Sequence, residues 1–120
     1  MSLPALLLLT LMSDGDTRLT LSPADSAQAC AATREVLVQV LIEAGKPPLL
    51  ALCGTSALQL SPYVHGVPPE AETHRYRVEI PSSGGFSVTP LAAQTPCAPV
   101  PDADPVVHCT RSSQRVLSDD

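Results

Sequence analysis

Four cysteines constrain the fold of this 120-residue chain more than any other feature. Aromatic residues make up only 2% of the chain and tryptophan is absent, so small aliphatic side chains must build the core. Each of these contributes roughly 1.5–3 kcal/mol when it is fully buried, and a domain of this size has a thin margin of stability. We therefore expect disulfide bonds to contribute much of the stability of this chain. The cysteines are Cys30, Cys53, Cys97 and Cys109.

An even number of cysteines behind an apolar leader predicts two disulfides. Cys97 and Cys109 would close the shortest loop, which favours that pair and leaves Cys30 with Cys53. Pairing Cys30 with Cys109 and Cys53 with Cys97 stays open, because sequence alone does not choose among the connectivities. Four buried thiols in a reduced cytosolic protein are a further alternative. Each bridge contributes about 3 kcal/mol in the chain-entropy model, so we expect reduction to destabilise the protein strongly.

Residues 3–12, LPALLLLTLM, form an apolar run that is too short to cross a bilayer as a helix, which takes about 20 residues. The run suits the apolar part of a signal peptide, and Ser13 and Gly15 are small residues at the positions that signal peptidase reads. We therefore expect a signal peptide at residues 1–15 of a secreted or periplasmic (cell-envelope) protein. The leader has no lysine or arginine, so a buried first strand or an N-terminal helix is the alternative. We expect no membrane insertion of the mature chain.

The segment from Pro23 to Ala44 carries helix signals at both ends. Ser22 is a favourable N-cap and Pro23 suits the first helical position, while Gly45 follows where a helix stops. Within this segment, however, residues 35–42 alternate β-branched and other side chains, which is a strand pattern. An all-β sandwich with a strand at 35–42 is therefore the alternative to a helix.

Five segments have the patterning of short strands: 17–21, 49–53, 74–80, 86–88 and 106–109. The segments 17–21 and 49–53 flank the expected helix, so we expect two parallel strands joined by a crossover through that helix. The segment 106–109 is expected to be a strand at the edge of the sheet. We therefore expect an α+β fold, a small two-layer domain with one helix packed on a mixed sheet of four to five short strands. Residues 16–110 would form this single disulfide-stapled domain. The polar residues 111–120 would be a disordered tail whose loss the domain tolerates.

The charge of the chain excludes two classes of partner. Its net charge is −5, with seven basic residues scattered along the sequence. Proteins that follow a nucleic-acid backbone or an anionic membrane surface need clustered basic residues. We therefore expect no nucleic acid as a partner, and expect another protein instead.

Motifs for catalysis or metal binding are absent from the sequence. It has no nucleophile elbow, phosphate-binding glycine loop or H-E-x-x-H pair. His108 and Cys109 are adjacent, so on a strand they would point to opposite faces, and no C-x-x-C pair is present. We therefore expect no enzyme, no cofactor and no metal site. A small metal-binding or enzymatic domain without a recognisable motif is the third function class. The histidines are His65, His74 and His108.

The loop between Cys97 and Cys109, with the sequence CAPVPDADPVVHC, is the candidate binding site. Its prolines fix φ and lower the entropy of the free loop, and a disulfide across its ends would order it further. Two oxygen ligands from its aspartates would suit a hard cation, but the sequence favours the simpler interpretation of a solvated acidic loop. The leading function hypothesis is a protein-binding domain, and the second is a secreted protease inhibitor that presents this loop. For the loop itself, the sequence favours a plain connector over a binding role. The candidate binding residues are Pro99, Val100, Pro101, Asp102 and Asp104.

Two short stretches, ADSAQACAA at 24–32 and RYRVE at 75–79, are similar to stretches of the bacterial subtilisin-inhibitor family. That resemblance implies inhibition of a secreted protease. The two stretches cover little of the chain, and the cysteine spacing departs from the family's pattern. The chain is therefore not assigned to this family.

Cleavage of the expected leader sets the first residue of the exported protein. The apolar run followed by Ser13 and Gly15 predicts a mature chain that starts near Asp16. N-terminal sequencing and intact mass of the protein exported by its native host measure this directly. An exported protein that still begins with Met1, or a protein that is not exported, would show the leader prediction to be wrong.

Overall fold

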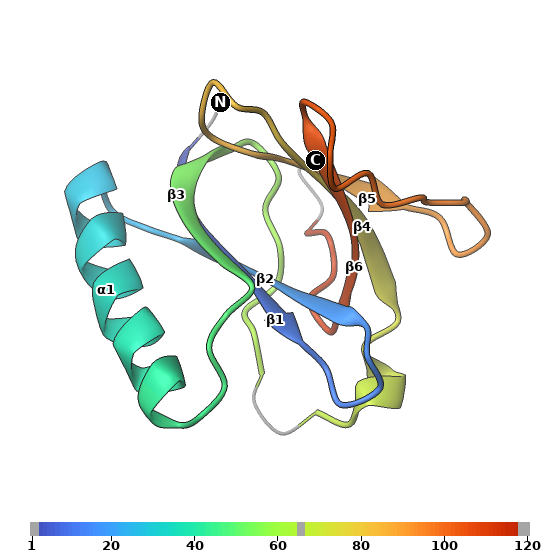
Figure 1. Ribbon diagram of the computed structural model, residues 1–120, viewed down its shortest axis with the longest axis horizontal. Helices are drawn as coiled ribbons and strands as arrows, with labels where there is room; N and C mark the ends of the chain where they lie inside the picture. Colours follow the sequence, from blue (N-terminus) through green and yellow to red (C-terminus); the bar gives the residue numbers. More distant parts are fainter. Residues whose placement is uncertain (1–2, 65–66, 118–120) are drawn as a thin grey trace.

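The computed structural model describes residues 3–64 and 67–117, which fold as one helix and a curled, mixed six-stranded sheet (Figure 1). This is an α+β arrangement with more strands than the four to five expected. A short 3₁₀ helix, η1, covers Pro69–Ala71. The helix is α1 (Ala27–Glu43), and the strands are β1 (Leu3–Leu11), β2 (Thr17–Pro23), β3 (Leu50–Ser56), β4 (His74–Ile80), β5 (Ser87–Leu91) and β6 (Val106–Ser112).

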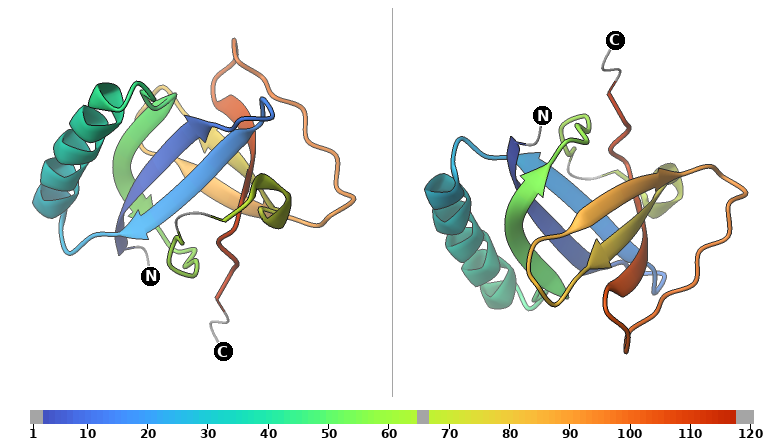
Figure 2. Two further views of the ribbon diagram at one scale, coloured as in Figure 1. Left: turned by 90° about the horizontal axis from the view of Figure 1, so that it is seen from below. Right: turned by 90° about the horizontal axis from the view of Figure 1, so that it is seen from above.

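The strand order in the sheet is β3-β1-β2-β6-β4-β5. All neighbours are antiparallel except β2 and β6, which run parallel and share a single register pair, Arg18 with Arg111. The sheet therefore divides at this seam into two three-stranded halves, which face each other (Figure 2). Because β1 is antiparallel to both β2 and β3, those two strands run in the same direction across the helix, as expected, but with β1 between them.

The apolar core lies between the two halves of the sheet. Leu7 and Leu9 of β1 face Tyr76 and Val78 of β4 in one buried cluster. Their spacing of two residues follows the alternation of a strand, which sends every second side chain to the same face. The Tyr76 hydroxyl is buried and donates to the backbone oxygen of Gln114 at 2.6 Å. The core thus rests mainly on aliphatic side chains, with one tyrosine whose polar end is satisfied.

Strand β1 is a central strand, and this explains the unbroken apolar run near the start of the sequence. It pairs with β2 on one side and with β3 on the other, and both of its faces carry buried side chains, Leu7 on one and Leu6 on the other. Strands buried on both faces are continuously apolar rather than alternating. The run therefore has the structure of a buried first strand, which was the alternative to a leader. Cleavage near Asp16 would remove the strand that joins β2 to β3.

The helix begins later than the sequence predicted. Its N-cap is Ser26, whose side-chain oxygen accepts a hydrogen bond from the Ala29 amide at 3.0 Å. Ser22 and Pro23 instead end β2, where they pair with the start of β1, so sheet pairing prevails over their capping preference. The alternative strand at 35–42 is wrong, because these residues are helical.

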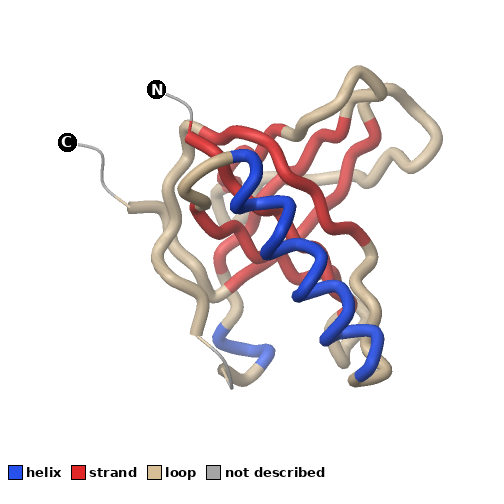
Figure 3. Tube along the Cα trace, turned by 90° about the vertical axis from the view of Figure 1, so that its left-hand side faces the viewer, coloured by secondary structure: helices blue, strands red, loops and turns tan. Residues whose placement is uncertain are grey.

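Helix α1 packs on the outer face of the sheet, mainly against β3 and β1 (Figure 3). Cys30 is the buried residue of the helix, while Val36 and Val40 are 64% and 53% exposed. Two specific links therefore hold the helix in place. One is the disulfide between Cys30 and Cys53 of β3, and the other is a 2.7 Å hydrogen bond from Arg34 Nε to the Ala51 carbonyl.

The end of the described chain is part of the fold, so the expected tail starts too early. Strand β6 runs past the expected domain end and lies between β2 and β4 rather than at an edge. The side chain of Gln114 is buried, accepts from the Leu21 amide at 2.9 Å, and donates to the carbonyls of Leu21 and Ser61 at 3.0 and 2.7 Å. It bridges the seam where β2 and β6 diverge. Residues 111–117 are therefore ordered parts of the fold, and residues 118–120 lie outside the described part of the chain.

Both disulfides of the favoured pairing are present, Cys30 with Cys53 and Cys97 with Cys109, and the alternative pairing is wrong. All four cysteines of the sequence are used. Two disulfides in a domain of this size are consistent with an oxidising compartment. Among the described residues, the structure contains no helix that is both long enough and apolar enough to span a membrane.

Glycine at position 54 lets the two halves of the sheet approach each other. A Cβ atom added to Gly54 of β3 would lie 2.8 Å from Cε2 of the Phe86 ring. We expect Gly54→Ala to lower the free energy of unfolding by about 1–3 kcal/mol, as overpacking of a close contact does. Urea denaturation measures it. In a Phe86→Leu background, Gly54→Ala should lower the free energy of unfolding by less. An equal loss of unfolding free energy in both backgrounds would contradict the contact between position 54 and the Phe86 ring.

Gln114 supplies hydrogen bonds that the sheet itself does not make. We expect Gln114→Ala to lower the free energy of unfolding by about 1–3 kcal/mol, because it leaves the buried backbone groups of Leu21 without a partner. Arg115→Ala is the matched control, because Arg115 is exposed and bonds the described part of the chain only through its backbone. The control should change stability by no more than about 0.5 kcal/mol. Similar stability for Gln114→Ala and the wild type would show that the bridge is dispensable.

The two disulfides restrain different parts of the fold. We expect the double variant Cys97→Ser with Cys109→Ser to lose about 3 kcal/mol of unfolding free energy, because its denatured loop is no longer closed. The double variant Cys30→Ser with Cys53→Ser should lose at least as much and should also free α1, seen as faster amide exchange across the helix. Thiol titration of the unreduced protein should find no free thiol. Four titratable thiols, or a melting curve that reductant leaves unmoved, would refute this account.

Candidate functional site

The loop closed by Cys97 and Cys109 follows β5, returns into β6 and lies on the side of the molecule opposite α1 (Figure 2). Three restraints hold it. The disulfide closes its base, and Val100 and Val107 exchange two backbone hydrogen bonds of 3.0 Å. Nearer its far end, Asp104 accepts from the amide and the hydroxyl of Ser82 at 2.9 and 2.6 Å, which ties the loop to the turn between β4 and β5.

The structure places every predicted binding residue on the solvent-facing part of this loop. Residues 98–104 are all exposed, and Val100 keeps 39% of its surface accessible although its backbone is paired. An apolar side chain that is fixed and exposed offers contact area at a low entropic cost of binding. The predicted residues, all exposed, are Pro99, Val100, Pro101, Asp102 and Asp104.

The two aspartates of the loop have different surroundings. Hydrogen bonds from the Ser82 side chain and amide lower the pKa of Asp104 below its ordinary value. Asp102 makes no hydrogen bond or ion pair with the described part of the chain and faces solvent. The described residues contain no group of three or more histidine, cysteine or acidic side chains arranged to hold a metal ion. The loop therefore presents one free carboxylate and one that clamps the backbone.

A buried ion pair escaped the sequence analysis. Arg18 of β2 binds Glu72 through two hydrogen bonds, Nε to Oε1 at 2.7 Å and Nη2 to Oε2 at 2.8 Å, and the Glu72 side chain is only 1% exposed. The pair fastens the segment after η1 to the sheet. No sequence signal could have found it, because Glu72 lies in a stretch rich in proline and glutamate without periodicity.

A groove runs along the outer face of the sheet beside α1. The helix packs mainly on β1 and β3, so the outward side chains of β2 border an open hollow of about 720 Å³. Leu37 and Leu41 of the helix form one wall, and the segment 60–63 forms the other. A second hollow of about 670 Å³ continues from there towards Lys46. Hydrophobic patterning identifies the apolar face of a helix but does not show how much of the sheet that helix covers.

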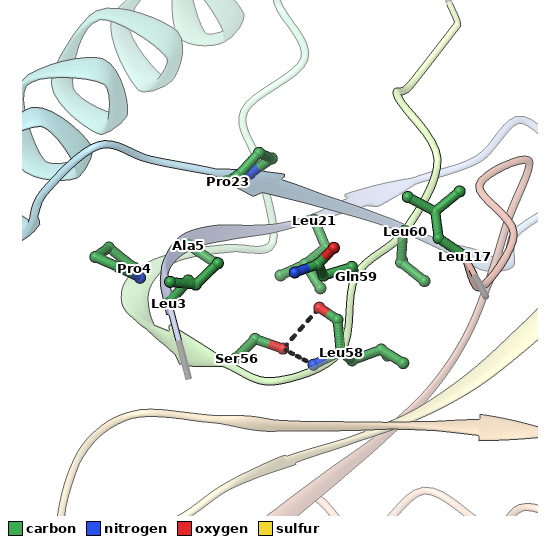
Figure 4. Close-up of a pocket in the computed structure, with 10 residues that line it drawn as sticks. All are labelled: Leu3, Pro4, Ala5, Leu21, Pro23, Ser56, Leu58, Gln59, Leu60 and Leu117. Carbon is green, nitrogen blue, oxygen red and sulfur yellow. Dashed lines mark hydrogen bonds between the residues drawn. The ribbon is translucent and has the colours of Figure 1, made fainter. Parts of the chain in front are cut away.

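A smaller pocket of about 240 Å³ lies where the start of β1 meets the ends of β2 and β3 (Figure 4). Its walls are largely apolar, with Leu3, Leu21 and Leu58 around the space. The Ser56 hydroxyl bonds the backbone amide and carbonyl of Leu58 at 3.1 and 3.2 Å, so it is already engaged. The pocket is therefore a site for apolar groups.

Comparison with known proteins returned no match, either to a protein-family model, to a curated protein or to a solved structure.

The clamp between Asp104 and Ser82 depends on pH with a definite sign. Because folding lowers the pKa of Asp104, the clamp is fully present above the ordinary aspartate pKa of about 3.9 and is lost as the pH falls through the lower, folded value. We expect Ser82→Ala to move the Asp104 pKa back up, measured by NMR titration of its carboxyl carbon. An Asp104 pKa that is unchanged in Ser82→Ala would contradict the clamp.

Proposed function

We propose that this protein is a non-enzymatic domain that binds another protein through the loop 98–104. The observation that carries the proposal is the combination of full exposure with three separate restraints on one short loop. A connector needs no such bracing, whereas a recognition loop gains affinity from it because less entropy is lost on binding.

The chemistry of the loop indicates the kind of partner surface. Pro99, Val100 and Pro101 present small, rigid apolar contacts, and Asp102 adds a free negative charge beside them. The complementary surface is a shallow apolar patch on a folded protein with a basic group at its rim. With two disulfides in the domain, the encounter would take place in an oxidising compartment such as the periplasm or the extracellular space.

Affinity capture from the medium or periplasm of the native host tests the proposal. Wild type and Val36→Asp, which alters an exposed residue on the opposite side of the molecule, should retain the same partner. Val100→Asp should lose it, with binding weakened by about tenfold or more because charge is placed in an apolar contact. A partner retained equally by all three proteins, or no partner for any of them, would refute binding through the loop.

Inhibition of a secreted protease is the second candidate function, favoured by the same bracing of an exposed loop on both sides of Val100. An inhibitor loop must enter an enzyme cleft without being released after cleavage, and restraints on both sides of it serve that purpose. A panel of secreted proteases tests this directly. Tight, saturable inhibition that Val100→Asp abolishes would make the partner a protease, and rapid digestion of the loop without inhibition would exclude the inhibitor.

A further inference from the structure

The two larger hollows on the side of α1 form one groove along the outer face of the sheet, because they share part of their lining. The two larger ones share Thr10, Arg18, Leu41 and Lys46. The larger of these also shares Leu21, Pro23, Leu60 and Leu117 with the pocket of Figure 4. A molecule lying in the groove would therefore extend from the C-terminal end of α1 to the end of β2 and the segment 60–63.

The two ends of this groove differ in chemistry. At one end lies Lys46, the only lysine of the sequence, which is exposed and makes no ion pair with the described part of the chain. Arg18 lies next to it along the groove, but Glu72 already neutralises its charge. At the other end lie the apolar side chains of Leu60 and Leu117. The groove thus combines a cation at one end with an apolar lining at the other.

We infer that the groove binds a single-chain anionic amphiphile, a free long-chain carboxylate, with its carboxylate at Lys46 and its alkyl chain running to Leu60 and Leu117. Leu37 and Leu41 of the helix wall and Leu8 of β1 line the path of the alkyl chain. Charge complementarity fixes the polar end, and burial of methylene groups supplies the affinity. This binding is separate from recognition by the loop on the opposite side of the molecule.

Other occupants suit the groove less well. An extended peptide binds by adding to a free strand edge, but β2 lies between β1 and β6, and the backbone groups of Leu21 are taken by Gln114. An anionic membrane surface is disfavoured by the net charge of −5. A monomeric carboxylate needs one cation and an apolar path, which the groove supplies.

Calorimetric titration of the full chain with dodecanoate, below its critical micelle concentration, tests the inference. Saturable binding is expected, and shortening the alkyl chain should weaken it by up to about fourfold for each methylene removed. Leu41→Glu should raise the dissociation constant by about tenfold or more, because Leu41 lines two of the hollows. Val40→Glu is the matched control on the neighbouring, exposed residue and should change it by less than about twofold.

The polar end has its own test, which does not depend on how Leu41→Glu folds. Lys46→Gln should weaken dodecanoate binding by roughly threefold to tenfold at low salt, and the effect should shrink as salt is added. The uncharged dodecanol should bind both proteins alike. Equal binding of dodecanoate to wild type and Lys46→Gln would overturn the assigned orientation.

Three outcomes would overturn the inference as a whole. These are no saturable binding of dodecanoate, a loss of binding as large in Val40→Glu as in Leu41→Glu, and association with anionic vesicles but not with the monomer. Loss of partner capture by Val100→Asp with dodecanoate binding unchanged would show that the two surfaces act independently.

Discussion

The double pairing of β1 is the constraint on which the rest of this fold depends. The strand bonds β2 along one side and β3 along the other, and it contributes side chains both to the core between the sheet halves and to the face under α1. Hydrogen bonding and burial are thus satisfied together by one stretch of nine residues. The groove beside the helix exists because α1 covers only this strand and its neighbour β3, leaving β2 partly open.

The seam between β2 and β6 is the weakest junction of the sheet, and a side chain rather than the backbone closes it. One register pair joins the two strands. The side-chain amide of Gln114 makes the two hydrogen bonds to the Leu21 backbone that a neighbouring strand would otherwise make. A side-chain amide carries both a donor and an acceptor, so it reproduces the two bonds of a strand partner. The segment that carries Gln114 also pairs with Leu60 through Val116, which closes the core at that end.

The parts of the fold that depend on local sequence patterns were predicted correctly from the sequence. The strand at 74–80 and the hairpin arm that follows it were predicted from alternation and a glycine turn, and both are present. The favoured disulfide pairing followed from loop length and is correct. The loop 98–104 was identified from its prolines and flanking cysteines, but its clamp to Ser82 was not, because that contact joins residues far apart in the chain. Gln114 was missed for the same reason, since a polar residue near the end of a chain carries no local sign of burial.

The start of the helix was predicted differently from what the structure shows, and the run at 3–12 has the buried-strand structure that the sequence left open as an alternative. Both outcomes have one physical reason. Ser22 and Pro23 are suitable for a helix start, and the run at 3–12 is suitable for a leader. In the structure both segments are strands, because Ser22 and Pro23 pair with residues of that run. Local preference is worth about 1 kcal/mol at a helix cap, and a paired, buried strand outweighs it.

The two outer strands of the sheet, β3 and β5, each carry a feature that disfavours pairing with a further strand. An unprotected strand edge is a template on which another chain can add, and such edges lead to aggregation. Here Arg34 reaches from the helix to bond the Ala51 carbonyl of β3, and β5 carries Pro90, which has no amide hydrogen to donate. Both ends of the sheet are thereby made poor partners for a further strand. A chain this rich in leucine and valine can thus expose a curled sheet to its surroundings and still resist stacking edge to edge.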